Sequence, residues 1–271
     1  MTADGFLPAL SAVINAFFLV AGVYIYVSLL RQVSARTVPP ETPLIRNFGL
    51  PEAIVAILLT LFFLLTLTGA SSQSAARMRD RDLIASAAFT IGLLLALAGF
   101  LRLRRLDLDS LGGFSRVGFF RAAVTGGVLI LAAYPLIIMA DVVTQRLLRT
   151  QPQKQAIVEM FSGSNTLQQR MLIIVLAISV APLAEEFIFR FFLYGVVRRY
   201  FGRALAVLVS AALFAAVHAH LPSFAPLFVL GACFAVAYEW SGSILVPMTM
   251  HAFFNAITLT ALAFPELVQQ Q

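Results

Sequence analysis

Long apolar runs separated by short polar stretches are the feature that most limits how this chain can fold. A helix needs about 20 mostly apolar residues to cross the hydrocarbon core of a bilayer, so 271 residues leave room for about eight such helices and little else. Hydrophobic residues make up 60% of the chain, against roughly 45–50% in soluble domains. The sequence therefore predicts an all-α fold, a polytopic membrane helix bundle of about eight transmembrane helices.

Clusters of proline, glycine and arginine mark where the apolar runs end. The predicted spans are residues 6–30, 51–70, 83–101, 121–140, 171–197, 204–221, 224–240 and 243–264. Alternating leucines and acids at 105–116 indicate an interfacial segment. Within the longest polar connection, residues 157–161 have the spacing of a short surface helix.

The charge pattern indicates a membrane setting and does not indicate a nucleic-acid partner. The net charge is +6, but most basic residues flank apolar runs, where they face the cytoplasm and anionic lipid. With eight spans, the odd-numbered connections carry eleven of the nineteen lysines and arginines. We therefore expect those connections in the cytoplasm, both termini outside, and the bacterial plasma membrane as the location. The single cysteine, Cys233, permits no internal disulfide.

Three charged residues interrupt the apolar run at 181–190, namely Glu185, Glu186 and Arg190. A charge at the membrane centre costs about 2.5–3.5 kcal/mol on insertion scales, so such residues indicate a functional site by default. Glu186 and Arg190 are four residues apart and can pair on one helix face. Glu185 points about 100° away from Glu186 and is left without this partner. It is therefore the acid that is free to do chemistry.

Two further polar pairs follow at the same helical spacing, Phe214 with His218 and His251 with Asn255. A carboxylate, two imidazoles and a carboxamide are sufficient to activate water and to stabilise an oxyanion. Each feature alone also has a structural interpretation. A Glu–Arg pair can clamp two helices, and an intramembrane histidine or asparagine can serve only as an interhelical hydrogen bond.

The three motifs resemble the CAAX protease and bacteriocin-processing family (CPBP, Abi) of intramembrane proteins, which includes the type II CAAX prenyl endopeptidases. The resemblance covers roughly residues 171–262, and its signature is Glu-Glu-x-x-x-Arg, Phe-x-x-x-His and His-x-x-x-Asn in this order. No signature position departs from the pattern. Residues 238–243, Tyr-Glu-Trp-Ser-Gly-Ser, are also similar to the family. The resemblance divides the chain into N-terminal transmembrane helices and interfacial segments at 1–170 and a catalytic core at 171–264, within one membrane-embedded unit.

The resemblance implies an intramembrane endopeptidase that forms no covalent intermediate. Glu185, helped by His218, would deprotonate a water that attacks the scissile carbonyl. His251 and Asn255 would donate hydrogen bonds to the resulting oxyanion. Glu186 and Arg190 would be structural, with Phe214 in a supporting position. The implied partners are the lipid bilayer and a membrane-associated peptide or protein substrate, and no residue here specifies a prenyl group.

Two alternatives remain open on the sequence. Two glutamates and two histidines could bind zinc, which would make the chain a zinc-dependent membrane protease. The compact His-Glu-x-x-His spacing is missing, however, and adjacent glutamates point about 100° apart, so we expect no metal and no other cofactor. The chain could also be a non-catalytic membrane scaffold or bacteriocin-immunity protein that uses the same fold for binding.

Overall fold

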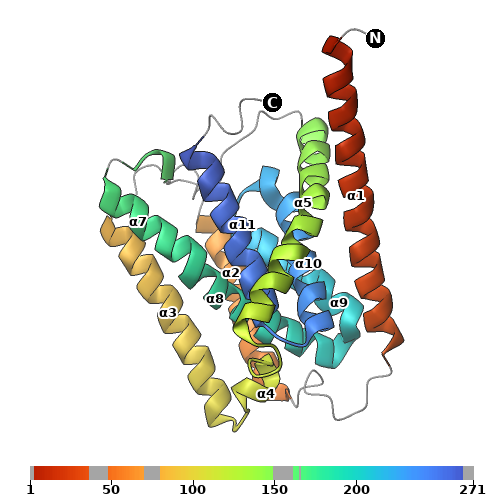
Figure 1. Cartoon of the computed structure of the whole chain (residues 1–271). Coiled ribbons are helices and arrows are strands. Elements are labelled where there is room, and N and C mark those ends of the chain that lie inside the picture. Colours follow the sequence, from red (N-terminus) through yellow and green to blue (C-terminus); the bar gives the residue numbers. More distant parts are fainter. Residues whose placement is uncertain (1–2, 37–47, 70–79, 149–160, 165, 265–271) are drawn as a thin grey trace.

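A computed structural model describes residues 3–36, 48–69, 80–148, 161–164 and 166–264. These residues form helices and no strand (Figure 1). The elements in chain order are α1 (Ala3–Ala35), α2 (Leu50–Gly69), α3 (Asp80–Leu103), α4 (Leu108–Gly112), α5 (Phe119–Leu148), α7 (Leu167–Val175), η3 (Leu176–Val180), α8 (Ala181–Glu186), η4 (Phe187–Leu193), α9 (Tyr194–Val217), η5 (Leu221–Ser223), α10 (Phe224–Ser241) and α11 (Leu245–Ala263).

Seven helical segments of the described chain are long and apolar enough to cross a membrane. One of them, Leu167–Val217, has 51 residues and would be about 77 Å long if straight, against a hydrocarbon core of about 30 Å. Gly202 divides it, because its φ of 81° and ψ of 176° are not helical. Ser210, beyond Gly202, donates to the carbonyl of Phe189 at 3.0 Å, so the chain folds back on itself. The predicted all-α polytopic bundle of about eight membrane helices is confirmed.

In Figure 1, helix α1 begins and helix α11 ends on the same side of the bundle, and α4 lies on the opposite side. At that opposite end the chain turns at Gly113 and Gly242, both with φ near 65°. A Cβ on Gly113 would lie 1.9 Å from the Gly242 carbonyl oxygen, so only glycine permits this contact. The backbone N–H of Ile244 completes the junction by donating to the carbonyl of Gly112 at 2.8 Å.

The stretch predicted to be interfacial forms the short helix α4. Asp107 caps its N-terminus by accepting from the backbone N–H groups of Asp109 and Ser110 at 3.1 and 3.3 Å. The hydrogen bond from Asp109 holds the pKa of the Asp107 carboxyl below its usual value. Leu111 and Gly112 are buried, so α4 is anchored against the bundle by its C-terminal half.

Two helices extend well beyond their predicted ends, and one predicted helix lies mostly outside the described residues. The first span continues to Ala35 instead of ending near residue 30. Likewise, α5 continues to Leu148 beyond the predicted end at 140, and within this extension the Thr144 hydroxyl donates to the Ala140 carbonyl at 2.7 Å. Of the predicted surface helix at 157–161, only residue 161 belongs to the described part of the chain.

Helix α10 belongs to the most enclosed of the membrane-length segments. In its membrane-length segment 61% of the residues are buried, compared with 11% in that of α3. Helices α5, α9 and α11 pack around α10, while much of α1, α2 and α3 remains exposed on the outside. The polar motifs of the sequence lie on α8, η4, α9 and α11, and η4, α9 and α11 all contact this enclosed helix.

Candidate active site

The two glutamates lie in α8, a short α-helix between two π-helical segments, η3 and η4. A π-helical turn contains one residue more than an α-helical turn and therefore rotates the side chains that follow it, and such turns are frequent at functional sites. Pro182 lies at the start of α8 and has no backbone N–H to donate. The local sequence thus gives Glu185 and Glu186 a backbone that departs from a regular helix on both sides.

Glu186 and Arg190 form the pair that their spacing predicts, fully buried and 3.0 Å apart between Oε1 and Nη1. The guanidinium also donates to the carbonyl of Gly231 at 3.3 Å. Its carbon lies 4.2 Å from the centre of the Phe214 ring and 5.1 Å from that of Phe234. Aromatic faces attract a cation and exclude water, so they stabilise this charge where solvent cannot.

His251 joins the same pair from α11. Its Nδ1 lies 2.9 Å from Glu186 Oε1, the oxygen that Arg190 also contacts. Because an ionised carboxylate only accepts hydrogen bonds, Nδ1 carries the proton of this contact. The ring stacks on Phe234 with 5.2 Å between centroids. Glu186 therefore fixes both the position and the protonated nitrogen of His251.

Glu185 has a different environment from its neighbour. Its Oε2 lies 3.9 Å from His251 Nε2, which is too long for a hydrogen bond. In the part of the chain that the structure describes, this buried oxygen has no hydrogen-bond partner. The side chain as a whole is 27% exposed. Glu185 is thus a partly exposed carboxylate whose Oε2 has no hydrogen-bond partner among the described residues.

His218 caps the C-terminus of α9, where helix carbonyls lack backbone partners. Its Nδ1 lies 2.7 Å from the carbonyl oxygen of Phe214. A carbonyl oxygen only accepts, so Nδ1 carries the proton, and Nε2 of the neutral ring holds a free lone pair. The histidine is therefore fixed in the tautomer that can accept a proton or a hydrogen bond at Nε2.

Asn255, one helical turn after His251, is fixed by a hydrogen bond to η3. Its Nδ2 donates to the carbonyl of Ala177 at 2.7 Å. The carboxamide has a second N–H and a carbonyl oxygen that this contact does not use. Asn255 can therefore donate to another group while it remains held in place.

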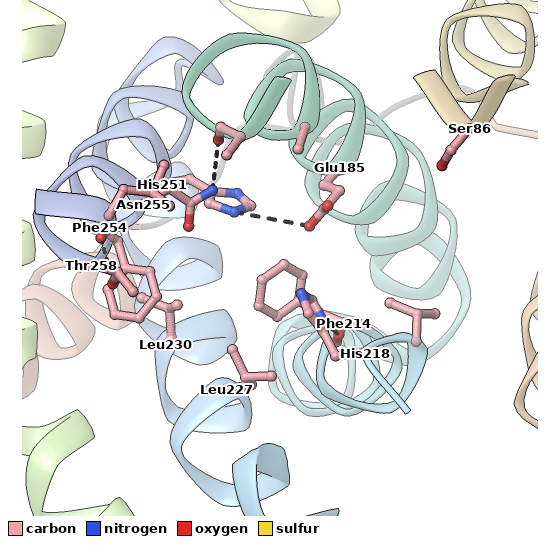
Figure 2. A pocket seen from close by; sticks show the side chains of 14 residues that line it. Ser86, Glu185, Phe214, His218, Leu227, Leu230, His251, Phe254, Asn255 and Thr258 are labelled. Carbon is pink, nitrogen blue, oxygen red and sulfur yellow. Dashed lines mark hydrogen bonds and ion pairs between the residues drawn. The ribbon is translucent and has the colours of Figure 1, made fainter. Parts of the chain in front are cut away.

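These side chains surround one cavity of about 420 Å³ (Figure 2). Its lining includes all four residues that the resemblance implies are catalytic, together with Phe214, and it excludes Glu186 and Arg190. The remaining lining residues are Ser86, Ala177, Ala181, Val217, Leu227, Leu230, Phe254, Thr258 and Leu259. In Figure 2, Glu185 points into the cavity, with His251 on one side and Phe214 and His218 opposite.

Sequence reasoning did not identify Ser86 of α3 as part of this cavity. A lone serine in an apolar run carries no signal of its own, and only the packing of α3 beside α8 brings it near the site. The contact between Glu186 and His251 was also missed, because 65 residues separate them in the chain.

The zinc alternative finds no support in the arrangement of side chains. Within the described ranges, no group of three or more His, Cys, Asp or Glu side chains is placed to hold a metal ion. Glu186 Oε1 is already engaged by Arg190 and His251. The absence of a bound metal in the working enzyme stays a prediction.

Comparisons with known proteins agree with the motifs. No curated protein and no solved structure matched the chain. Residues 167–257, about a third of the chain, match the family model described as type II CAAX prenyl endopeptidase Rce1-like. All seven motif residues lie inside this match, and the family assignment made from them is confirmed. Over residues 167–257 the chain is therefore similar to the Rce1-like CAAX prenyl endopeptidases, and this similarity together with its apolar helices supports a multi-pass membrane protease of the CAAX type.

Proposed function

We propose that this protein is a glutamate-dependent endopeptidase that hydrolyses a peptide bond of a membrane-associated polypeptide with an activated water. One observation carries the proposal: Glu185, His218, His251 and Asn255, from three different helices, line the same cavity. The reaction needs a base, an acceptor that orients the water, and donors for an oxyanion. This cavity offers each of these groups.

Glu185 is the proposed base. Its carboxylate lines the cavity and can accept one proton of a water, while Nε2 of His218 accepts the other proton in a hydrogen bond. The water oxygen then attacks the scissile carbonyl carbon, and Glu185 takes the first proton. When the C–N bond breaks, Glu185 returns this proton to the leaving amine, so the enzyme ends in its starting state.

Asn255 and His251 are the proposed oxyanion donors. Asn255 would use its second N–H, which the bond to Ala177 leaves available. The Nδ1–H of His251 donates a hydrogen bond to Glu186. His251 can therefore also donate from Nε2 only when both nitrogens carry a proton, that is, as an imidazolium. The positive charges of this imidazolium and of Arg190 would together balance the negative charges of the two glutamates. Removing one such donor typically costs about 2.7–4 kcal/mol of transition-state stabilisation.

Glu186 and Arg190 have a supporting role in this proposal. Their ion pair positions the acceptor of His251 and lies behind the cavity wall. Phe214 contributes in two ways, since its ring faces Arg190 and its carbonyl holds His218. The substrate would be a peptide or protein segment at or within the bilayer, and we place the enzyme in the bacterial plasma membrane.

The test compares the chain termini of membrane proteins and peptides from cells that carry the wild type or Glu185→Gln. We expect new termini only with the wild type, and a fluorogenic peptide spanning such a cleavage site should be hydrolysed by the purified enzyme. Prenylated and unprenylated forms of that peptide then define the substrate class. Identical sets of termini for both proteins would argue for a non-catalytic scaffold.

A further inference from the structure

A gap in the backbone hydrogen bonds of η3 lies directly beside the site. The N–H of Ala181 bonds to the carbonyl of Leu176, five residues earlier, as π-helical geometry requires. In the same register the next bond would run from residue 182 to the carbonyl of Ala177. Residue 182 is a proline and has no N–H. The carbonyl of Ala177 is therefore left without this backbone donor.

The side chain of Asn255 takes the place of the missing donor. Its Nδ2 lies 2.7 Å from the Ala177 carbonyl oxygen, across 78 residues of sequence. A carbonyl oxygen only accepts, so the carboxamide has to present its NH₂ group and not its oxygen. A buried carbonyl without a partner is costly, and Ala177 is buried, so the contact is strongly favoured in this orientation.

We propose that Pro182 is a positioning residue for Asn255. By withholding an N–H it keeps the Ala177 carbonyl open, and this carbonyl fixes the Asn255 amide with its second N–H available to the cavity. The catalytic consequence rests on the oxyanion role proposed for Asn255. The structural part, that Pro182 keeps the acceptor available, stands independently of that role.

Pro182→Ala tests the inference because it adds back the N–H while removing a helix breaker. The restored N–H would compete with Asn255 for the Ala177 carbonyl and release the amide. We expect kcat on the fluorogenic peptide to fall by about 10- to 100-fold, the range for a misplaced catalytic group. KM should change little, and the melting temperature should stay or rise, because alanine suits a helix better than proline. Pro182→Gly also carries an N–H and should reduce kcat similarly.

Two controls distinguish the effect on kcat of adding an N–H from the effect of losing the proline ring. Replacing Pro182 by lactic acid supplies the methyl group of alanine but an ester oxygen in place of the N–H, so kcat should stay near that of the wild type. Pro135→Ala removes the proline inside α5 and should leave kcat unchanged. If the lactic acid variant is as slow as Pro182→Ala, the inference is wrong.

A double-mutant cycle distinguishes failure of this inference from failure of the proposed function. If Pro182 acts through Asn255, Pro182→Ala should not lower kcat further in an Asn255→Ala background. Two outcomes overturn the positioning role alone. In one, Pro182→Ala lowers kcat equally in the wild-type and Asn255→Ala backgrounds. In the other, Pro182→Ala keeps full kcat while Asn255→Ala is slow. Full kcat in Asn255→Ala instead overturns the oxyanion role, and with it the catalytic importance of the contact.

Discussion

Two clusters of charged residues lie on the same few helices, and they differ in the ratio of arginines to carboxylates. The first surrounds Glu239 near the end of α10, where Oε1 contacts Arg198 at 2.9 Å and Arg203 at 3.0 Å. Its other oxygen accepts a hydrogen bond from Tyr194 at 2.5 Å. The second is the site, where Glu185 and Glu186 are adjacent and Arg190 pairs with Glu186. The Glu239 cluster thus contains two arginines and one carboxylate, whereas the site contains one arginine and two carboxylates.

The difference separates a structural cluster from a reactive one. Around Glu239 both carboxylate oxygens are engaged, and Arg203 also donates to the carbonyl of Val33, which ties α1 to α9 and α10. In the site, Oε2 of Glu185 and Oε2 of Glu186 both have no hydrogen-bond partner among the described residues, and of these two acids only Glu185 lines the cavity. Buried carboxylates with complete partners hold elements together, whereas an uncompensated one in a cavity is poised for chemistry. Replacing each acid in turn therefore tests the comparison.

Glu186→Gln should have the largest effect on stability. The substitution leaves Arg190 without a counter-charge in a fully buried setting, and breaking such a pair typically costs 3–5 kcal/mol. It also weakens the acceptor that holds His251. We expect low yield and a lowered melting temperature in detergent, measured against the wild type. A stable but inactive Glu186→Gln would show that the two glutamates have exchanged roles.

Glu185→Gln should reduce activity without reducing stability. Glutamine keeps the shape of the side chain and removes only the base, so turnover should fall by roughly 100-fold or more. The side chain lies 3.9 Å from His251 Nε2, too far for a hydrogen bond, so little stabilisation is lost and the melting temperature should match that of the wild type. Turnover and thermal unfolding are measured on the same preparation. Retained turnover would contradict the assignment of Glu185 as base.

Glu239→Gln should have a smaller effect on stability than Glu186→Gln. Arg203 is partly exposed, so water can compensate part of its charge, and glutamine still offers an oxygen to one arginine. We expect a loss of about 2 kcal/mol, below the range for a fully enclosed pair. The folded fraction should retain the kcat of the wild type. A fall in kcat at unchanged stability would mean that the two clusters are coupled.

The contrast between the clusters also shows what the sequence could reveal. The Glu186–Arg190 pair was predictable because both residues lie on one helix at a fixed spacing. The Glu239 cluster was not, because its arginines lie 36 to 41 residues earlier, on either side of the reversal at Gly202. Local periodicity determines which residues share a helix face, whereas contacts between helices depend on how the helices pack.

The same limit applies to the site. Helical spacing and the family resemblance identified the four residues that line the cavity, but not the hydrogen bonds that fix their donors and acceptors. The bond between Asn255 and Ala177 depends on a π-helical register that no composition pattern predicts. The tautomer of His218 depends on a free carbonyl in the last turn of α9. These details follow from backbone geometry and could only be found in three dimensions.

Metal removal should have the smallest effect on turnover and stability. It tests whether the site differs from the Glu239 cluster in its positive charge. A bound zinc ion would add a positive charge beside Glu185 and would make the site resemble the fully partnered Glu239 cluster. The side chains argue against such an ion, since Glu186 Oε1 is engaged by Arg190 and His251 Nδ1 points toward Glu186. Zinc normally needs three protein ligands even in catalytic sites. We therefore expect protein treated with strong chelators to keep its turnover and melting temperature. Stoichiometric zinc by elemental analysis, with turnover lost on its removal and regained on its return, would replace the water-activating glutamate by a metal mechanism.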